Sequence, residues 1–240
     1  MDESLSNLIS PIREAARRAI LRLIPAECFL CGADGDFDVL CPACVAVLPR
    51  WQGAGACPTC ALPGTGGRIC ARCIVHPPAF DATLAAYDYG FPVGQLIHAL
   101  KYRTALDLAG WLGKRLVAVA GSAWDVVLPV PLHAQRLRER GFNQSLELAR
   151  PLTRNGLPLL REGVSRRRPT RAQAGLDARA RRRNVHRAFQ VEVDLARRHV
   201  LVVDDVMTTG ATLDALALEL RRAGASRVVN LVVARTPQSF

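Results

Sequence analysis

The chain has 240 residues, half of them hydrophobic and 22% charged, so it can bury a substantial core and is not a disordered protein. No stretch approaches the roughly 20 apolar residues of a membrane-spanning helix, and the opening segment MDESLSNLIS lacks the basic and apolar regions of a signal peptide. We therefore expect a globular, cytoplasmic protein. Its formal charge of +11 favours polyanionic partners such as phosphate ligands or nucleic acid.

The first predicted element is an amphipathic helix over residues 11–24. Its sequence, PIREAARRAILRLI, places Ile12, Ala16 and Ile20 near one helical face and most of its arginines elsewhere. The apolar stripe is short and has no Trp or Phe, so we expect the helix to pack on its own protein rather than on a membrane. Residues 1–25 form the first predicted segment.

The second predicted segment, residues 26–78, is rich in Cys, Gly and Pro and has few apolar runs, so burial alone cannot hold it. It contains four CxxC pairs, separated by nine, twelve and nine residues. Two such pairs supply the four tetrahedral sulfurs that Zn²⁺ prefers. The sequence therefore predicts a double zinc ribbon with two structural ions, whose ligands are Cys28, Cys31, Cys41, Cys44, Cys57, Cys60, Cys70 and Cys73.

Two alternatives stay open for these cysteines. Disulfides also use an even number, but they are rare in reducing compartments, and four regular pairs exceed what a redox motif needs. The short spacings favour one ion for the first four cysteines and one for the last four. An arrangement that interleaves the first pair with the third is also compatible with the spacing.

The third predicted segment, residues 79–240, alternates apolar strands with helical patterns. A strand or hairpin is expected at 82–90, and strands at 124–132, 157–164, 199–206 and 227–235. One or two helices are expected at 93–120, and further helices at 143–154 and 212–225. Such alternation predicts an α/β fold with a mostly parallel sheet flanked by helices.

The stretch VLVVDDVMTTGAT, residues 200–212, joins a buried strand to two acids and a small-residue loop. Ligands bind at the carboxyl ends of strands in such sheets, where helix N-termini present free amides. The loop amides and the hydroxyls of Thr208, Thr209 and Thr212 can surround a phosphate, and Gly210 permits close backbone approach. Carboxylates accept hydrogen bonds from hydroxyls, so the adjacent acids suggest a sugar diol and hence a ribose 5-phosphate.

This stretch resembles the phosphoribosyl pyrophosphate (PRPP) signature of type I phosphoribosyltransferases. More narrowly, the chain from about residue 25 onward resembles the ComF family (ComFC, GntX-like), which is linked to DNA uptake in natural competence. The CxxC ribbons, LIHALKYR at 96–103, PVPLHAQRLRERGFNQS at 129–145 and RAQAGLDARARRRNVHRAF at 171–189 support this resemblance.

The resemblance implies roles for particular residues. Asp204 and Asp205 would hold the ribose hydroxyls, and the loop would hold the 5-phosphate, so the PRPP site would comprise Asp204, Asp205, Met207, Thr208, Thr209, Gly210, Ala211 and Thr212. The turn after LPVP, around Pro131 to Arg136, would bind pyrophosphate with Mg²⁺, and its candidates are Pro131, Arg136 and Arg140.

The segment 161–187 holds ten arginines against Glu162 and Asp177, so it carries +8 of the net +11. Three interpretations stay open: a surface for single-stranded nucleic acid, a lid whose guanidinium groups clamp pyrophosphate, or a solvated helix face. The first gives as candidate nucleic-acid contacts Arg166, Arg167, Arg168, Arg171, Arg181, Arg182 and Arg183.

The sequence thus favours a protein that binds PRPP or a related ligand, and single-stranded DNA, during DNA uptake, with other uptake proteins as possible partners. The alternatives are a phosphoribosyltransferase acting on an unidentified base or amine, and a PRPP-sensing regulator without turnover. Glutamine-dependent amidotransfer is not expected, because that chemistry uses an N-terminal cysteine nucleophile and residue 2 is aspartate.

Overall fold

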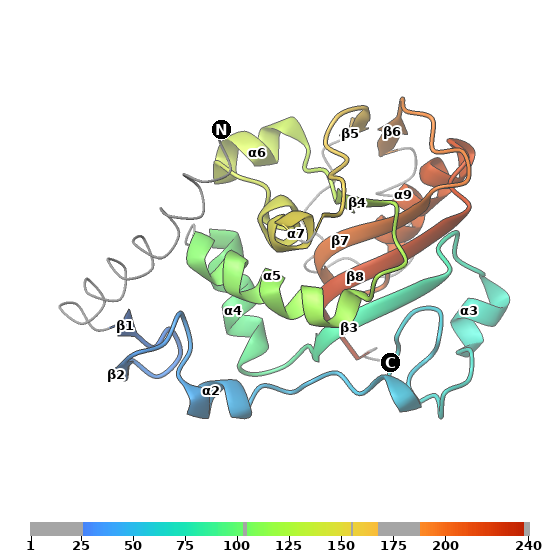
Figure 1. Cartoon of the computed structure of the whole chain (residues 1–240). Coiled ribbons are helices and arrows are strands. Elements are labelled where there is room, and N and C mark those ends of the chain that lie inside the picture. Colours follow the sequence, from blue (N-terminus) through green and yellow to red (C-terminus); the bar gives the residue numbers. More distant parts are fainter. Residues whose placement is uncertain (1–25, 103–104, 155, 168–187, 238–240) are drawn as a thin grey trace. The chain divides into compact units, whose positions relative to one another are not determined.

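The computed structural model describes residues 26–102, 105–154, 156–167 and 188–237 (Figure 1). It divides into two compact units, residues 1–48 and residues 49–240. The predicted helix at 11–24 lies outside the described residues, and the predicted segment boundaries after residues 25 and 78 stay predictions. Within the described ranges, no helix is both long and apolar enough to cross a bilayer.

The described part of the first unit is built from very short elements. Strand β1 (Ala26–Glu27) pairs antiparallel with β2 (Asp34–Gly35), and helix α2 (Pro42–Ala46) follows. Gly32 lies in the turn between the strands with φ +70°, where a residue with a side chain is strained. Elements of two to five residues bury too little apolar surface to be stable alone, so other interactions must hold this unit.

The second unit begins with a similar small module and continues into the α/β part. The 3₁₀ turn η1 (Gly53–Gly55) and helix α3 (Ala71–Val75) belong to the module. A four-stranded sheet follows, in the order β3 (Ala82–Asp88), β8 (Arg227–Arg235), β7 (His199–Met207), β4 (Val126–Pro129). All three pairings are parallel. The predicted α/β class with a parallel sheet is confirmed.

Helices cover both faces of this sheet (Figure 1). Helices α5 (Leu106–Ala120) and α7 (Gln144–Arg154) pack on one face, and α9 (Ala211–Arg222) packs on the other. Helix α4 (Val93–Tyr102) packs on α5. Val200 and Val202 join the core on the α9 side, while Leu201 and Val203, which alternate with them, are equally buried. The continuous apolar run of β7 is thus explained, because both of its faces are covered.

The structure differs from the sequence-based prediction at three short elements. Helix α6 (Ala134–Arg140), whose N-cap is His133, was not predicted. The predicted strand at 157–164 reduces to one bridge between Leu159 and Val127, because the neighbouring Pro158 has no N–H to extend the pairing. A two-stranded antiparallel ladder, β5 (Val164–Arg166) with β6 (Phe189–Val191), was also missed.

The close approach of α5 and α7 predicts the effect of one substitution. A Cβ atom at Gly113 would lie 2.6 Å from the carbonyl oxygen of Leu148 and 2.8 Å from Cγ of Pro151. We expect Gly113→Ala to lower the free energy of unfolding by about 1–3 kcal/mol, because backbone and a proline ring cannot move aside easily. Urea denaturation measures this change.

Gly110 is the matched control on the same helix, because a Cβ atom there meets nothing within 4 Å. Gly110→Ala should raise stability by about 0.5–1 kcal/mol through better helix propensity. Equal effects of the two substitutions would contradict the packing described for α5 and α7.

Candidate functional site

A pocket of about 410 Å³ opens at the carboxyl ends of the four parallel strands. Tyr89 follows β3, Thr236 follows β8, Val130 follows β4, and β7 contributes its last residues and the loop after it. Every strand of the sheet therefore supplies part of the wall. This is the edge at which open α/β sheets bind ligands, and the volume suits a small phosphorylated molecule.

Asp204, near the end of β7, is partly buried in this pocket. Its Oδ1 accepts hydrogen bonds from the Oγ of Ser145, at 2.9 Å, and from the backbone N–H of Asp205, at 3.0 Å. Burial and the neighbouring charge of Asp205 raise the pKa of Asp204 to about 7. The carboxyl group is thus oriented by two donors but is poorly solvated, which leaves its outer lone pairs available for a ligand.

Asp205 is buried and forms an ion pair with Lys101 at the end of α4, with 3.0 Å between Oδ2 and Nζ. Burial alone would lower the pKa of Lys101, but the negative charge of Asp205 outweighs that effect and the pKa is raised. Lys101 therefore stays protonated and lines the pocket as a fixed positive charge.

The loop between β7 and α9 has the geometry of an anion site. Gly210, the N-cap of α9, has φ +76°, and a Cβ atom there would lie 2.5 Å from Cε of Met207. The N–H of Ala211 donates to Oγ1 of Thr209 at 3.4 Å. Within the described chain, the N–H groups of Thr209 and Gly210 donate to no protein atom. Free amides at the start of a twelve-residue helix attract a phosphate group.

Basic side chains form another part of the pocket wall. Arg136 and Arg140 come from α6, and Arg166 comes from β5. The guanidinium carbon of Arg140 lies 5.5 Å from the ring centre of Tyr102, which also lines the pocket. Burial and the nearby charge of Arg136 lower the pKa of Arg166. The pocket thus combines two carboxylates with several cations.

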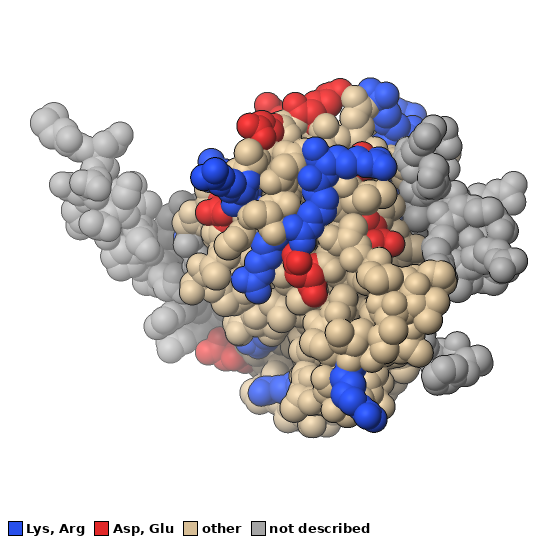
Figure 2. Space-filling view, turned by 90° about the vertical axis from the view of Figure 1, so that its right-hand side faces the viewer, with Lys and Arg blue, Asp and Glu red and all other residues tan. Residues whose placement is uncertain are grey.

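Charge is not uniform over the surface outside this pocket. Figure 2 shows a face on which Lys and Arg side chains gather in separate groups beside Asp and Glu side chains, on a mostly uncharged surface. On the described part of this face, a polyanion would therefore bind to a small area rather than to the whole face.

Most of the predicted ligand residues come together in the pocket. Thr209 instead lines a smaller cavity beside the second cysteine group, and the walls include the neighbours of Pro131 rather than Pro131 itself. Arg167 is exposed and lies 3.8 Å from Glu192. The predicted residues that line the pocket are Asp204, Asp205, Met207, Thr208, Gly210, Ala211, Thr212, Arg136, Arg140 and Arg166. Outside the described residues lie Arg168, Arg171, Arg181, Arg182 and Arg183.

Sequence reasoning missed several pocket residues. It placed Lys101 in no site and assigned no role to Ser145, Tyr89 or Tyr102. Ser145 lies 59 residues from its partner Asp204 in the chain, so only the folded arrangement connects them. The available signals were a lysine in the last turn of an apolar helix and a serine at the start of another, which are common features without a specific meaning.

The eight cysteines form two groups of four, and within each group all sulfur atoms lie within 4.8 Å of one another. One group contains Cys28, Cys31, Cys41 and Cys44, and the other contains Cys57, Cys60, Cys70 and Cys73. Consecutive CxxC pairs thus share a site, and the interleaved arrangement is excluded.

The two groups are a tandem structural repeat. Each cysteine of the first has a counterpart 29 residues later. The N–H of Cys41 donates to Sγ of Cys28 at 3.3 Å, and the N–H of Cys70 donates to Sγ of Cys57 at 3.4 Å. Burial alone would raise the pKa of Cys28 and of Cys57, but backbone donors outweigh it and lower these values to about 6 and about 7. These backbone donors favour the thiolate, the form that binds metal, at one cysteine of each group, whereas burial raises the pKa of Cys44 and of Cys73.

Both groups fit zinc. A tetrahedral ion with Zn–S bonds of about 2.3 Å separates its sulfurs by about 3.8 Å, and the distances Cys31–Cys41 and Cys60–Cys70 are 3.7 and 3.6 Å. Disulfide sulfurs are about 2.05 Å apart, and all eight cysteines are free. Each group could therefore hold one ion with four protein ligands and no open position.

The fold and this pocket define the class of protein, and a match to a domain family agrees with them. The family of the phosphoribosyl transferase domain matches residues 151–239. An allosteric regulatory enzyme of purine biosynthesis of known structure is 21% identical, with a TM-score of 0.37, over 57% of this chain and 30% of that one. The parallel sheet and the match to the phosphoribosyl transferase domain give the chain a type I phosphoribosyltransferase-like fold, joined to small cysteine modules of the zinc-ribbon type.

Relatives identify the family more narrowly. DNA utilization protein YhgH of Escherichia coli O157:H7 is 35% identical over 226 residues, which cover 89% of this chain and 98% of that protein. Competence protein F of Haemophilus influenzae is 31% identical, over 66% of this chain and 75% of the relative. Competence protein ComFC of Bacillus subtilis is 24% identical, over 85% and 92%. The chain belongs to this ComF family of DNA utilization and competence proteins, as its sequence motifs predicted.

The cysteine geometry predicts the metal content. The purified chain should contain about two zinc ions, and Cys44→Ser or Cys73→Ser, which remove equivalent ligands of the two groups, should each lower this to about one. Elemental analysis by mass spectrometry measures the ratio. A metal-free chain whose cysteines are all oxidised would show that the groups are disulfides.

Proposed function

We propose that this protein binds PRPP or a related phosphoribosyl ligand, binds single-stranded DNA, and acts in DNA uptake during natural transformation. We propose a cytoplasmic location, which agrees with eight cysteines that form no disulfide bond in the structure. The observation that carries the ligand assignment is that Asp204 and Asp205 line the same pocket as the loop after β7. This juxtaposition suits a molecule with hydroxyls beside a phosphate.

The 5-phosphate belongs in the loop between Met207 and Thr212. Free N–H groups at Thr209 and Gly210, the positive end of the α9 dipole and the threonine hydroxyls all favour a dianion there. The backbone carbonyl oxygens of Met207 and Thr208 accept hydrogen bonds from Arg235. They therefore point away from the proposed phosphate position.

The ribose hydroxyls belong on the two carboxylates. Oδ1 of Asp204 accepts hydrogen bonds from Ser145 and from the N–H of Asp205. A ligand hydroxyl can therefore donate to the other carboxyl oxygen. Asp205 is held by Lys101, which prevents its side chain from turning away and compensates its charge. Charge-assisted hydrogen bonds of this kind contribute about 1.5–3 kcal/mol each.

A pyrophosphate group belongs on the basic side chains of the pocket. Arg136, Arg140 and Arg166 line the same pocket as the acids, and guanidinium groups bind phosphate oxygens in pairs. Mg²⁺ would enter with PRPP, since it binds phosphate oxygens and carboxylates and keeps several waters. Asp204 and Asp205 are the carboxylates of this pocket within the described residues.

The role in DNA handling rests on the family and on charge. Relatives are named for DNA utilization and competence, and residues 161–187 carry most of the net positive charge of the chain. Arginine neutralises backbone phosphates and stacks on unpaired bases. Arg166 and Arg167 are the described candidates at the start of this segment.

The ligand assignment predicts a loss of affinity in one double variant. Replacement of both acids, Asp204→Ala/Asp205→Ala, should weaken PRPP binding by about 10-fold or more, because two charge-assisted hydrogen bonds are lost. Isothermal titration of the purified chain with PRPP and Mg²⁺ measures the affinity. The same titration with a labelled oligonucleotide over a salt series measures DNA binding, which should weaken steeply as salt rises.

Asp107→Ala is the control, because it removes an exposed carboxylate from the first turn of α5, outside the pocket. Its PRPP affinity should equal that of the wild type. The pocket assignment is wrong if the double variant binds PRPP as tightly as the control. Absence of oligonucleotide binding at low salt would contradict the DNA assignment alone.

A further inference from the structure

Arg235, the last residue of β8, connects the second cysteine group to the loop of the ligand pocket. Its side chain is fully buried. Nε donates to the carbonyl oxygen of Cys60 at 2.7 Å, and Nη1 donates to the carbonyl oxygens of Met207, at 3.1 Å, and Thr208, at 2.7 Å. One planar guanidinium group thus holds two segments that are far apart in the sequence.

The second cysteine group also lies beside a buried cation, because the guanidinium group of Arg235 is fully buried and its Nε donates to the carbonyl oxygen of Cys60. A buried cation needs compensating negative charge nearby. Four thiolates around one divalent zinc ion keep a net negative charge, so the metal-bound group would supply that compensation.

Packing joins the same two regions. All four cysteines of the second group share a hydrophobic core with Met207, Ala211 and Leu213. A cavity of only about 30 Å³ separates Cys60 and Cys73 from the loop residues, so the loop has little room to shift against the cysteine group.

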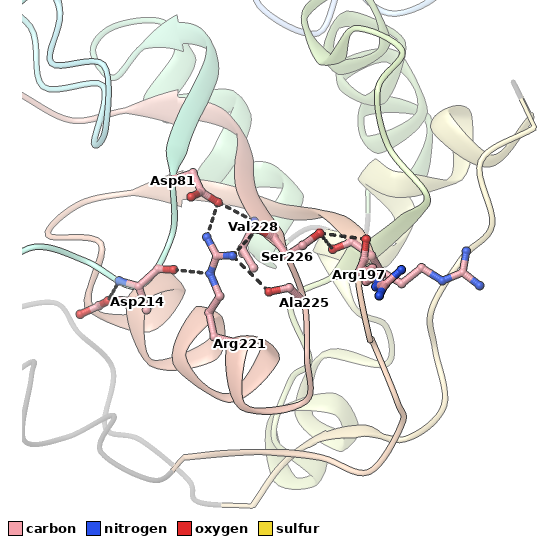
Figure 3. Close-up of polar contacts among 9 residues, drawn as sticks. Asp81, Arg197, Asp214, Arg221, Ala225, Ser226 and Val228 are labelled. Atoms are coloured by element: carbon pink, nitrogen blue, oxygen red, sulfur yellow. Dashed lines mark hydrogen bonds and ion pairs between the residues drawn. The ribbon is translucent and has the colours of Figure 1, made fainter.

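The segment that leaves the second cysteine group is also fixed to α9, the helix that begins at the loop. Oδ1 of Asp214 accepts from the N–H of Ala79 at 2.8 Å, and Nε of Arg221 donates to the carbonyl oxygen of Ala79 at 3.2 Å. Arg221 also forms an ion pair with Asp81, which accepts from the N–H of Val228 (Figure 3). Hydrogen bonds therefore hold both ends of the loop, at Met207 and at α9, to the second cysteine group and the segment that follows it.

We propose that the metal-bound second cysteine group anchors the phosphate loop, and that Arg235 is the positioning residue that transmits this anchoring. Metal loss from this group then loosens the loop and weakens ligand binding, whereas metal loss from the first group does not. The two halves of the tandem repeat therefore have different roles: the first belongs to the compact unit 1–48, and the second belongs to the unit that contains the pocket.

Hydrogen exchange in the whole chain tests the anchoring without any ligand. The N–H of Asp214 is bonded to Gly210 at 2.8 Å and that of Thr236 to Met207 at 3.1 Å, so both report on the loop. In Cys73→Ser these amides should exchange about 10-fold faster or more, with one zinc ion retained per chain. In Cys44→Ser, the equivalent substitution in the first group, their exchange should equal that of the wild type.

Arg235 is tested separately from the metal. Arg235→Met should retain about two zinc ions and still show fast exchange at Asp214 and Thr236, and Arg235→Lys should restore part of the protection because it keeps a charged donor. Wild-type exchange in Cys73→Ser, or equal acceleration in Cys44→Ser, overturns the proposal. If Cys73→Ser does not fold, the two Arg235 variants decide: wild-type exchange in Arg235→Met overturns it.

The effect on ligand binding rests on the proposed function and is measured with PRPP. Affinity should fall about 10-fold in Cys73→Ser and Arg235→Met and stay unchanged in Cys44→Ser. If the wild-type chain does not bind PRPP, the proposed function fails, whereas the exchange measurements still decide whether the second cysteine group anchors the loop.

Discussion

Two adjacent acids at the carboxyl end of a buried strand are the constraint on which this pocket depends. Asp204 and Asp205 repel each other, and both are partly or fully removed from water. The fold stabilises them with a hydroxyl from α7 and an ammonium group from α4. Because these partners come from different helices, the acids are held in this orientation only when α4, α7 and β7 are packed together.

The parallel sheet explains why this arrangement is possible. Its four strands end at one edge, so their following loops converge on one small volume. The acids, the guanidinium groups and the start of α9 all contribute to the lining of this volume. A ligand that carries both phosphate groups and a sugar matches this mixture of charges.

The tandem cysteine modules show how one local structure can serve two roles. Their turns and sulfur geometry agree, but residues 26–48 contain four acids and no Lys or Arg, while residues 49–78 contain three arginines and no acid. The second module shares the core of the larger unit, whereas the first belongs to a compact unit of its own. The two modules differ in the residues between the cysteines, not in the cysteines that would bind metal.

Local patterns in the sequence predicted much of the fold and the centre of the site. The strand at 199–206 was visible because an apolar run ends abruptly in two acids, and the cysteine groups were visible because CxxC spacing fixes the geometry of a metal site. Lys101 and Arg235 were not predictable, because their partners lie 104 and up to 175 residues away and neither residue belongs to a local motif. Short elements such as α6 and the β5–β6 ladder were missed since they carry too few periodic residues.

The pH dependence of stability tests the buried state of Asp204 most directly. A carboxyl group with a folded pKa of about 7 and an unfolded pKa of about 3.9 binds more protons when folded, so the wild type loses stability as pH rises from about 4 to about 7. Asp204→Asn keeps the acceptor but does not titrate. Its stability relative to the wild type, from urea denaturation, should therefore increase across that interval and level off above it. A difference that stays constant with pH, or that changes in the opposite direction, would contradict the account.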